Sequence, residues 1–394
     1  MLFTKSNTAT RLFNAAPDMS ALVNDEMLKD SAFHPNLGGV TKGGMANHYP
    51  MTIMSLQGLG ASDEDIRNFR STWPRYRSKI SDDLRLMDKG VITQENWPDY
   101  LGQANMLADF QRVFFEGLNV TDDQNAYLLT VLERLQYALP MGLFHPLIRL
   151  SFAMMHGDKG LIADALAYWA IRYEDLYKRM LPPRTDLTTL SASALSASAA
   201  ENWALLHAAK PQISFWGGSL SVCERLCSEP VLHDIAVAEN FFITEENLEL
   251  KMQEIGDRAI SLYLYEPALT TLHSVTAYQA LADITQQMLD SGNGTRPVLA
   301  ELWQRYWVWL TGLYLEKGFP ETLPTVAEDA QQYVDASDWQ DIASGITSVP
   351  EVHAIKMVFS CKWLYEHIEA NPLYKAAAIN VLAEHTGIKP VALN

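Results

Sequence analysis

The fold class is decided by the stretch Thr121-Asp-Asp-Gln-Asn-Ala-Tyr-Leu-Leu-Thr-Val-Leu-Glu-Arg-Leu135. It opens with polar residues that cap helices, and its apolar residues then recur at 128, 131, 132 and 135, the spacing of one helix face. The same pattern returns along most of the chain, whereas alternating strand-like runs bounded by Asn-Gly or Asp-Gly are absent. The sequence therefore predicts an all-α fold, with further helices over 62–70, 98–117, 159–180, 195–209, 219–237, 245–263, 267–290, 297–316, 350–369 and 372–386.

One stretch interrupts this helical pattern. Residues 181–190 contain two prolines, and residues 191–200 are almost entirely serine and alanine. The stretch 181–200 is either a linker between two lobes or a tightly packed helix whose small side chains let backbones approach. Because candidate metal ligands lie on both sides of it, we expect one continuous domain over 1–394, with a site assembled across this seam.

Composition excludes several partners. The chain has 394 residues with 30 Lys and Arg against 47 Asp and Glu, a net charge of −17 that would repel a phosphate backbone, so nucleic acid is not expected as a partner. No apolar run reaches the roughly 18 residues of a membrane span, and the N-terminus lacks a signal-peptide pattern. Three cysteines, Cys223, Cys227 and Cys361, are too few for a disulfide framework and are expected to be reduced. We expect a cytoplasmic protein; its oligomeric state is not indicated.

Five residues stand out from the helical background: His48, His145, His273, His353 and Lys356. Imidazole nitrogens suit iron, copper, zinc or nickel, and separate helices can each supply one nitrogen to a buried metal. His48 and His145 closely precede prolines, which predicts positions at helix starts. Ser348-Val-Pro-Glu351 is expected to cap the helix that carries His353 and Lys356, which at i and i+3 share one face.

An ordinary interpretation applies to each of these residues. The chain has ten histidines, and a single buried histidine more often completes a core hydrogen bond than binds a metal. An isolated lysine usually extends its ammonium group to solvent. His34, His207, His233, His367 and His385 have no comparable context and are expected on surfaces or helix faces. His156 follows His145 by three turns, about 16 Å along a helix, and is a candidate cavity residue rather than a ligand.

Several blocks, in order along the chain, resemble the questin oxidase-like family: Gly43-Gly-Met-Ala-Asn-His-Tyr-Pro-Met51, Leu59-Gly-Ala-Ser62, Asn96-Trp-Pro-Asp-Tyr-Leu-Gly102, Phe144-His-Pro-Leu-Ile-Arg-Leu150, Leu272-His-Ser-Val-Thr-Ala277 and His353-Ala-Ile-Lys356. The resemblance covers most of the chain except about 181–262. It implies oxidative cleavage of anthraquinone-type polyketide rings, described as Baeyer–Villiger-like oxygen insertion. It also implies a non-haem Fe(II) held by His48, His145, His273, His353 and Lys356, with the lysine carried as its CO₂-derived carbamate.

The carbamate is chemically reasonable. Four neutral imidazoles leave a buried divalent cation uncompensated, and an ammonium group beside it would add repulsion. Burial and a nearby cation both lower the pKa of a lysine, so a neutral amine becomes accessible near pH 7 and can capture CO₂. Lys356 would then return as an anionic oxygen ligand.

The expected partners are O₂ and a small aromatic substrate. Candidate substrate contacts are Tyr49, Phe144, Arg149, His156 and Tyr278, although such residues are more often core, and Arg149 equally suits pairing with a carboxylate. No flavin or NAD(P) motif is present, since the glycine-rich run 38–44 lacks phosphate-loop spacing.

Two other functions stay open at this point. One is a metal-free helical protein that binds an aromatic ligand. The other is a zinc hydrolase with a carbamylated lysine, which usually needs a further carboxylate. Glu351 is the obvious candidate, but two residues from His353 on a helix it is expected to face elsewhere, which weakens that alternative.

Overall fold

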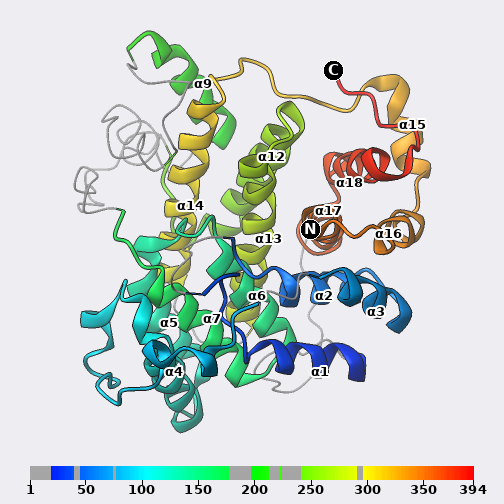
Figure 1. The fold of residues 1–394 in the computed structure, drawn as a ribbon. Coiled ribbons are helices and arrows are strands. Elements are labelled where there is room, and N and C mark those ends of the chain that lie inside the picture. The colour runs from blue at the N-terminus through cyan, green and yellow to red at the C-terminus, as the bar shows by residue number, and fades with distance from the viewer. Residues whose placement is uncertain are drawn as a thin grey trace.

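The computed structural model describes residues 19–39, 45–73, 77–176, 197–212, 222, 241–290 and 296–394. Within these ranges the chain forms fifteen α-helices and no β-strand, which confirms the all-α prediction (Figure 1). The helices are α1 Ala21–Asp30, α2 Tyr49–Gly58, α3 Asp63–Thr72, α4 Leu107–Val120, α5 Gln124–Leu135, α6 His145–His156, α7 Lys159–Ile171, α9 Ala199–Ala209, α12 Leu248–Tyr265, α13 Leu269–Asp290, α14 Arg296–Glu316, α15 Glu328–Ala336, α16 Trp339–Thr347, α17 Val352–His367 and α18 Pro372–Thr386.

Four of these helices, α2, α6, α13 and α17, form the centre of the molecule, and we call them the ring helices. α6 packs against α2 and α13, and α17 packs against both α2 and α13, so the four close into a ring. Other helices cover them from outside: α7 lies on α6, α12 and α14 lie on α13, α18 lies on α17 and α1 lies on α2. The ring therefore brings together segments that are about 300 residues apart in the sequence (Figure 1).

The apolar content of each helix matches how much of that helix is buried. α7 reads Lys-Gly-Leu-Ile-Ala-Asp-Ala-Leu-Ala-Tyr-Trp-Ala-Ile and is buried from Leu161 to Ile171 except at Asp164, because α4 and α6 cover both of its sides. α3, in contrast, lies at the surface and buries only Ile66 and Phe69. It begins with the predicted capping box of Ser62 and Asp65. The buried apolar side chains form one connected core that runs from Val23 to Val391.

Several helix boundaries differ from the prediction. The expected helix 98–117 is broken, because Gly102 has a positive φ of 82° and lies between two 3₁₀ turns, the second of which leads directly into α4 at Leu107. The helix expected over 159–180 ends at Ile171, and residues 173–176 are not helical. The short helices α15 and α16 were not predicted. The predicted helix 219–237, apart from residue 222, and the seam at 181–196 lie outside the described residues.

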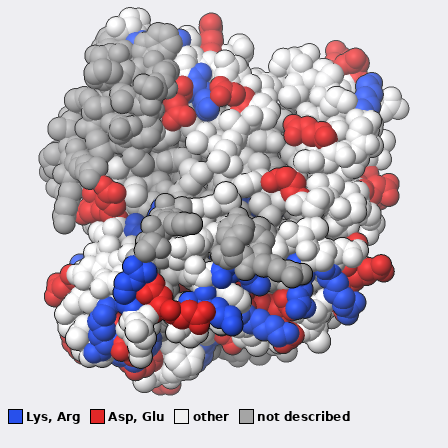
Figure 2. All heavy atoms as spheres, viewed as in Figure 1, with Lys and Arg blue, Asp and Glu red and all other residues white. Residues whose placement is uncertain are grey.

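The surface mixes charges of both signs. Figure 2 shows Lys and Arg side chains next to Asp and Glu side chains on the lower part of the face. Ion pairs such as Arg67–Asp63 and Arg112–Glu116 lie on the surfaces of α3 and α4. Cys361 is buried and unpaired, as expected, whereas Cys223 and Cys227 lie outside the described residues. In the described part of the chain, no helix combines the length and the apolar character needed to cross a membrane.

Candidate metal centre

His48 and His145 lie at helix starts, as predicted. His48 is the N-cap of α2, and His145 is the first residue of α6, directly after Phe144 with its positive φ of 61°. Both rings are buried and both are anchored through Nδ1. His48 Nδ1 donates to the carbonyl oxygen of Ala46 at 2.6 Å, and His145 Nδ1 donates to that of Gly142 at 2.6 Å.

His273 and His353 come from the N-terminal parts of the other two ring helices. His273 lies in the second turn of α13, and its Nδ1 donates to the Leu269 carbonyl oxygen at 2.7 Å. His353 is the second residue of α17, and its Nδ1 lies 3.0 Å from Glu351 Oε1. Its side chain is 25% exposed, so it marks the place where this group of rings approaches the surface.

The four imidazoles meet at one point. Nε2 of His145 lies 2.9 Å from Nε2 of His48 and 3.3 Å from Nε2 of His273. The ring of His353 is 4.9 Å from that of His48 and 5.4 Å from that of His273, between centroids. Each ring helix therefore contributes one histidine from its first residues, and we call this group the histidine cluster.

The hydrogen bonds to backbone carbonyl oxygens determine which nitrogen of each ring is unprotonated. A carbonyl oxygen only accepts hydrogen bonds, so Nδ1 of His48, His145 and His273 must carry the proton and Nε2 must present a lone pair. Three lone pairs gathered in this way, with the Nε2 atoms of His48 and His273 lying 2.9 and 3.3 Å from that of His145, repel unless a proton or a metal ion lies among them. In the described part of the chain, these three histidines are a group whose ligand atoms all lie within 4.8 Å of one another.

Burial keeps these imidazoles neutral. Desolvation, followed by the charge of Lys356, lowers the pKa of His145 to about 3. The pKa values of His48 and His273 lie well below the ordinary value for the same two reasons, in the same order. Neutral imidazole is the form that binds a metal ion, so the cluster is ready to act as a ligand set at neutral pH.

Lys356 faces the cluster from one turn further along α17. Its side chain is 1% exposed, and no described residue lies within hydrogen-bonding distance of Nζ. Burial lowers its pKa to about 7, an effect that Glu351 partly opposes. The ordinary interpretation, an ammonium group that reaches solvent, is therefore wrong for Lys356.

Glu351 corrects two of our predictions. It, and not Ser348, is the N-cap of α17, because its carboxylate accepts the hydrogen bond of the Ala354 N–H; Ser348 instead ends α16. As an N-cap it stands outside the helical geometry, and its other oxygen reaches His353 rather than facing elsewhere. Burial alone would raise its pKa, but the hydrogen bonds from His353 and Ala354 hold that pKa at about 2.

Four of the five candidate substrate residues, Tyr49, Phe144, Arg149 and Tyr278, have the contacts of core residues. Tyr49 donates from its hydroxyl to Glu26, Tyr278 donates to the Met252 carbonyl oxygen, and Arg149 pairs with Asp30 at 3.5 Å. The ring of Phe144 packs on Trp309 of α14. His156 ends α6, at the opposite end from His145. The structure brings none of them together with the cluster through a direct hydrogen bond among the described residues, and a role in substrate binding stays a prediction.

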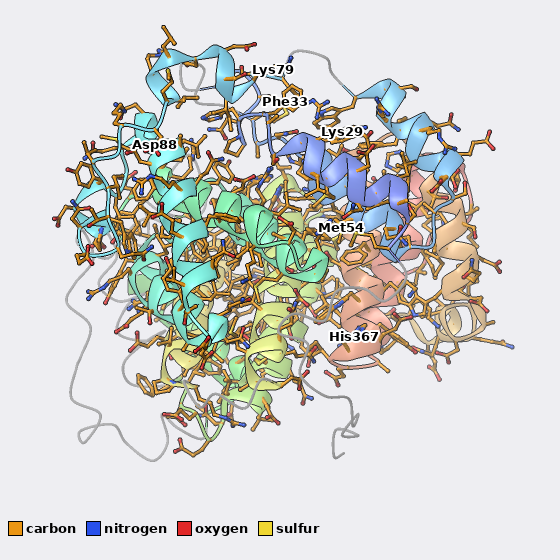
Figure 3. The ribbon with its side chains drawn as sticks, turned by 90° about the horizontal axis from the view of Figure 1, so that it is seen from below. Lys29, Phe33, Met54, Lys79, Asp88 and His367 are labelled. Atoms are coloured by element: carbon orange, nitrogen blue, oxygen red, sulfur yellow. The ribbon has the colours of Figure 1, made fainter. Side chains whose placement is uncertain are left out.

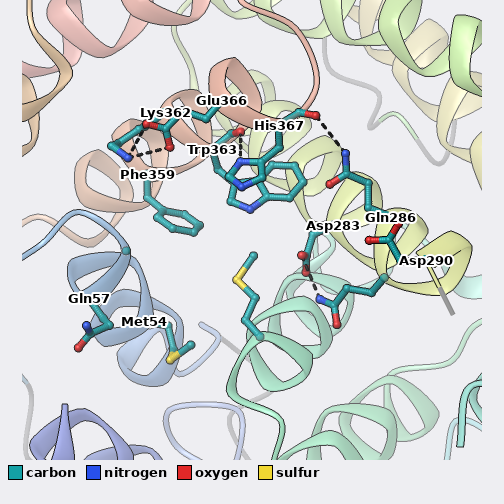
Figure 4. A pocket seen from close by; sticks show the side chains of 13 residues that line it. Met54, Gln57, Asp283, Gln286, Asp290, Phe359, Lys362, Trp363, Glu366 and His367 are labelled. Carbon is teal, nitrogen blue, oxygen red and sulfur yellow. Dashed lines mark hydrogen bonds and ion pairs between the residues drawn. The ribbon is translucent and has the colours of Figure 1, made fainter. Parts of the chain in front are cut away.

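A pocket of about 450 Å³ lies where the ring helices end (Figure 4). Its walls come from the same four helices: Met54 and Gly58 of α2, Met155 of α6, Asp283 to Asp290 of α13 and Phe359 to His367 of α17. Met54 and His367 appear on neighbouring helices in the view from below (Figure 3). Sequence reasoning missed this pocket. The signal that would have pointed to it is the pair Asp283 and Gln287, polar residues four apart near the end of α13 that both line the pocket.

The family comparison agrees with the earlier resemblance. The family model described as Questin oxidase-like matches residues 45–361, a range that holds all five candidate ligands and also the region 181–262 in which no resemblance was noted. No curated protein matches the chain significantly. Because this match covers most of the 394 residues, the chain belongs to the questin oxidase-like family, and that membership indicates an oxidoreductase with an oxygenase-type function.

Proposed function

We propose that this protein is a non-haem iron oxygenase that opens the ring of an aromatic polyketide or of an anthraquinone- or hydroquinone-type substrate. The observation that carries the proposal is the meeting of bare imidazole nitrogens with a buried, unpartnered lysine amine. Family membership supports the oxygenase class, and the site supports a metal. His48, His145, His273, His353 and Lys356 are the proposed ligands.

The donor set fits a divalent transition metal. Neutral imidazole suits iron, and a hydrogen bond on the far nitrogen fixes the orientation of each ring and raises its basicity. All four histidines have such a bond: three to backbone carbonyl oxygens and one to the Glu351 carboxylate. When bound, ferrous iron would supply the one-electron chemistry that lets O₂ react with an organic molecule.

Lys356 completes the charge balance in this proposal. The four ring helices all begin at the cluster, so the positive ends of their dipoles point towards it and disfavour a cation. An anionic ligand would offset this. The neutral amine of Lys356, accessible near pH 7, would attack CO₂, forming an N–C bond and releasing one proton, and would remain as a carbamate with a negative oxygen.

Glu351 acts here through His353. Its carboxylate is held on one side by the start of α17 and on the other by His353 Nδ1, so it orients the ring at the exposed edge of the cluster. Because both contacts are already occupied, it is not a free base for hydrolysis. This is why we propose the oxygenase rather than the zinc hydrolase, even though a nitrogen-rich site also suits zinc.

The first test is metal content. Protein purified without chelators and reconstituted anaerobically with Fe(II) should hold about one iron per chain, and His145→Ala should lose most of it. His34→Gln is the matched control. His34 is also buried, with its pKa lowered to about 4 chiefly by desolvation, but it is not part of the histidine cluster. Iron binding should survive in that variant.

The second test is oxygen uptake by the iron-loaded protein with a panel of hydroxyanthraquinones and hydroquinones. We expect substrate-dependent uptake that His145→Ala abolishes. Iron binding without uptake would contradict the substrate class. Absence of iron after reconstitution would contradict the site itself and leave a helical binding protein as the better interpretation.

A further inference from the structure

Helix α1 presents two buried carboxylates to the start of α2. Glu26 and Asp30 are four residues apart on α1, so they share one face of the helix, and their side chains are 5% and 0% exposed. α1 packs directly on α2 (Figure 1). Acidic side chains are almost never fully buried unless they are paired, so the partners of these two carboxylates indicate what they do.

The two carboxylates hold the residues on either side of His48. Asn47 Nδ2 donates to both oxygens of Asp30, at 3.0 Å each. The Tyr49 hydroxyl donates to Glu26 Oε2 at 2.6 Å. Asn47 and Tyr49 are also joined to each other, because Asn47 Oδ1 accepts the hydrogen bond of the Tyr49 N–H at 3.3 Å. His48 therefore lies between two residues that are both anchored to α1.

Asp30 also reaches the helix that carries His145. Arg149 follows His145 by one turn on α6, and its Nη2 lies 3.5 Å from Asp30 Oδ2. On its other side Asp30 binds Asn47, which directly precedes His48. His48 and His145 form the shorter of the two contacts between Nε2 atoms in the histidine cluster, at 2.9 Å against 3.3 Å. One carboxylate thus links the two segments that supply this pair of nitrogens.

We propose that Glu26 and Asp30 are positioning residues, which set where Nε2 of His48 lies relative to Nε2 of His145. They act through the residues next to His48 and not on the metal itself. Metal ligands have to be held within about 0.5 Å of their working geometry. Hydrogen bonds are directional whereas apolar contacts are not, so carboxylates can provide such precision. This role rests on the proposed function, because its purpose is to hold a metal ligand.

Arginines balance the charge of both carboxylates. Arg70 Nη1 lies 2.9 Å from Glu26 Oε1, and Arg77 Nη1 lies 2.6 Å from Asp30 Oδ1. The Arg77 guanidinium also lies over the ring of Tyr49, 4.8 Å from its centroid. Apolar residues of similar volume are often as stable as a buried ion pair, or more stable, so stability alone does not account for this arrangement. Its position beside His48 does.

The decisive experiment is a double-mutant cycle between Asp30→Asn and His48→Ala, with Co(II) as the metal probe. In the otherwise wild-type chain, Asp30→Asn should weaken Co(II) binding about tenfold and shift the visible absorption bands of the bound ion, which report its coordination geometry. In the His48→Ala background the same substitution should change the affinity by less than about twofold, because the ligand that Asp30 positions is gone. A loss of equal size in both backgrounds would overturn the proposal.

The matched control is Asp109→Asn on α4. Asp109 is also fully buried and also holds a neighbouring segment, because it accepts the backbone N–H groups of Lys89 at 3.0 Å and Val91 at 3.3 Å. That segment carries no cluster histidine. Asp109→Asn should therefore lower the melting temperature, while Co(II) affinity and the absorption bands stay as in the wild type. Equal changes in Co(II) binding in Asp109→Asn and Asp30→Asn would show that both act through general stability.

A milder variant covers the case in which Asp30→Asn does not fold. Tyr49→Phe removes only the hydroxyl that binds Glu26, and it should weaken Co(II) binding and shift the absorption bands. Its control is Tyr314→Phe, which removes a buried hydroxyl that donates to the Pro320 carbonyl oxygen at 2.9 Å. Co(II) binding should not change in the control. The same result in Tyr49→Phe would contradict the role of Glu26.

NMR of metal-free protein labelled with ¹⁵N-histidine gives a readout that does not depend on a metal. The ring signals of His48, assigned by their loss in His48→Ala, should move in Asp30→Asn and stay in place in Asp109→Asn. Unmoved His48 signals in Asp30→Asn would overturn the proposal. Should the wild type bind neither Co(II) nor Fe(II), the proposed oxygenase function fails, but these signals still decide whether α1 positions His48.

Discussion

At the scale of single residues, His353 is held differently from the other three histidines. Their Nδ1 atoms bind backbone carbonyl oxygens, whereas that of His353 binds a carboxylate. A charged acceptor makes the stronger hydrogen bond and raises the basicity of the far nitrogen. Glu351 therefore compensates for the position of His353 at the exposed edge of the cluster, where water competes for the ring.

Glu351→Ala should lower metal affinity about 10- to 100-fold, the usual effect of removing a hydrogen-bond partner behind a metal ligand. It should also cost roughly 1 kcal/mol of stability, because α17 loses its N-cap. Chelator competition measures the first effect and urea unfolding of the metal-free protein the second. Asp158→Ala removes the corresponding N-cap from α7 and is the control that separates the loss of stability from the loss of metal affinity. The Asp158→Ala variant should lose a similar amount of stability and keep its metal affinity. An equal loss of metal affinity in both variants would refute the role of Glu351.

Sequence reasoning was strongest at this scale, where it rested on local chemistry. Prolines beside His48 and His145 predicted helix starts, and the structure places both there. Glu351 was misjudged because one residue decides whether a side chain lies inside a helix or caps it. Arg149 was left between a substrate role and an ion pair, and its partner Asp30 is 119 residues away, beyond any local pattern.

At the scale of elements, the site depends on how α2 and α17 cross. Gly58, at the end of α2, packs directly on Phe359 of α17, and a Cβ atom there would lie 2.3 and 2.8 Å from two ring carbons. Both helices carry a cluster histidine at their other ends, His48 and His353. A change in their packing therefore alters the distance between two proposed ligands.

Gly58→Ala should destabilise the protein by about 1–3 kcal/mol, the usual cost of overpacking, and should also weaken metal binding. The control is Gly345→Ala on α16, where the added methyl group would meet Leu382 of α18 and no residue of a ring helix. Chemical denaturation and metal titration of both variants check this prediction. If Gly345→Ala weakened metal binding as much as Gly58→Ala, general loss of stability would explain both.

The sequence predicted which helices exist better than it predicted the residues at which they begin and end. α12, α13, α14 and α18 fall within a few residues of their predicted ranges, because long apolar periodicity defines them. Residues 98–106 were misassigned because the positive φ of Gly102 depends on a tertiary contact: the Gly102 N–H donates to the Ala170 carbonyl oxygen of α7. Periodicity in one segment carries no information about such a partner.

At the scale of the whole molecule, the cluster joins four segments that no local pattern connects. His48 and His353 are 305 residues apart, and their rings lie 4.9 Å from each other. The five residues were singled out from sequence, but their meeting depends on the ring of α2, α6, α13 and α17, which periodicity does not predict. One domain over 1–394 stays a prediction, because the seam at 181–196 lies outside the described residues.

A metal bound by all four ring helices should stabilise the whole fold, because the unfolded chain offers no such site. Binding to the folded state alone adds RT ln(1 + [L]/Kd), about 2.7 kcal/mol at a hundredfold excess over Kd. We expect anaerobic Fe(II) to raise the melting temperature by about 3–5 °C in differential scanning calorimetry. In His145→Ala the shift should vanish, while in His34→Gln it should persist. A shift of the same size in His145→Ala would place the stabilising metal elsewhere. A shift that calorimetry resolves as one cooperative transition would show that the segments before and after the seam unfold together.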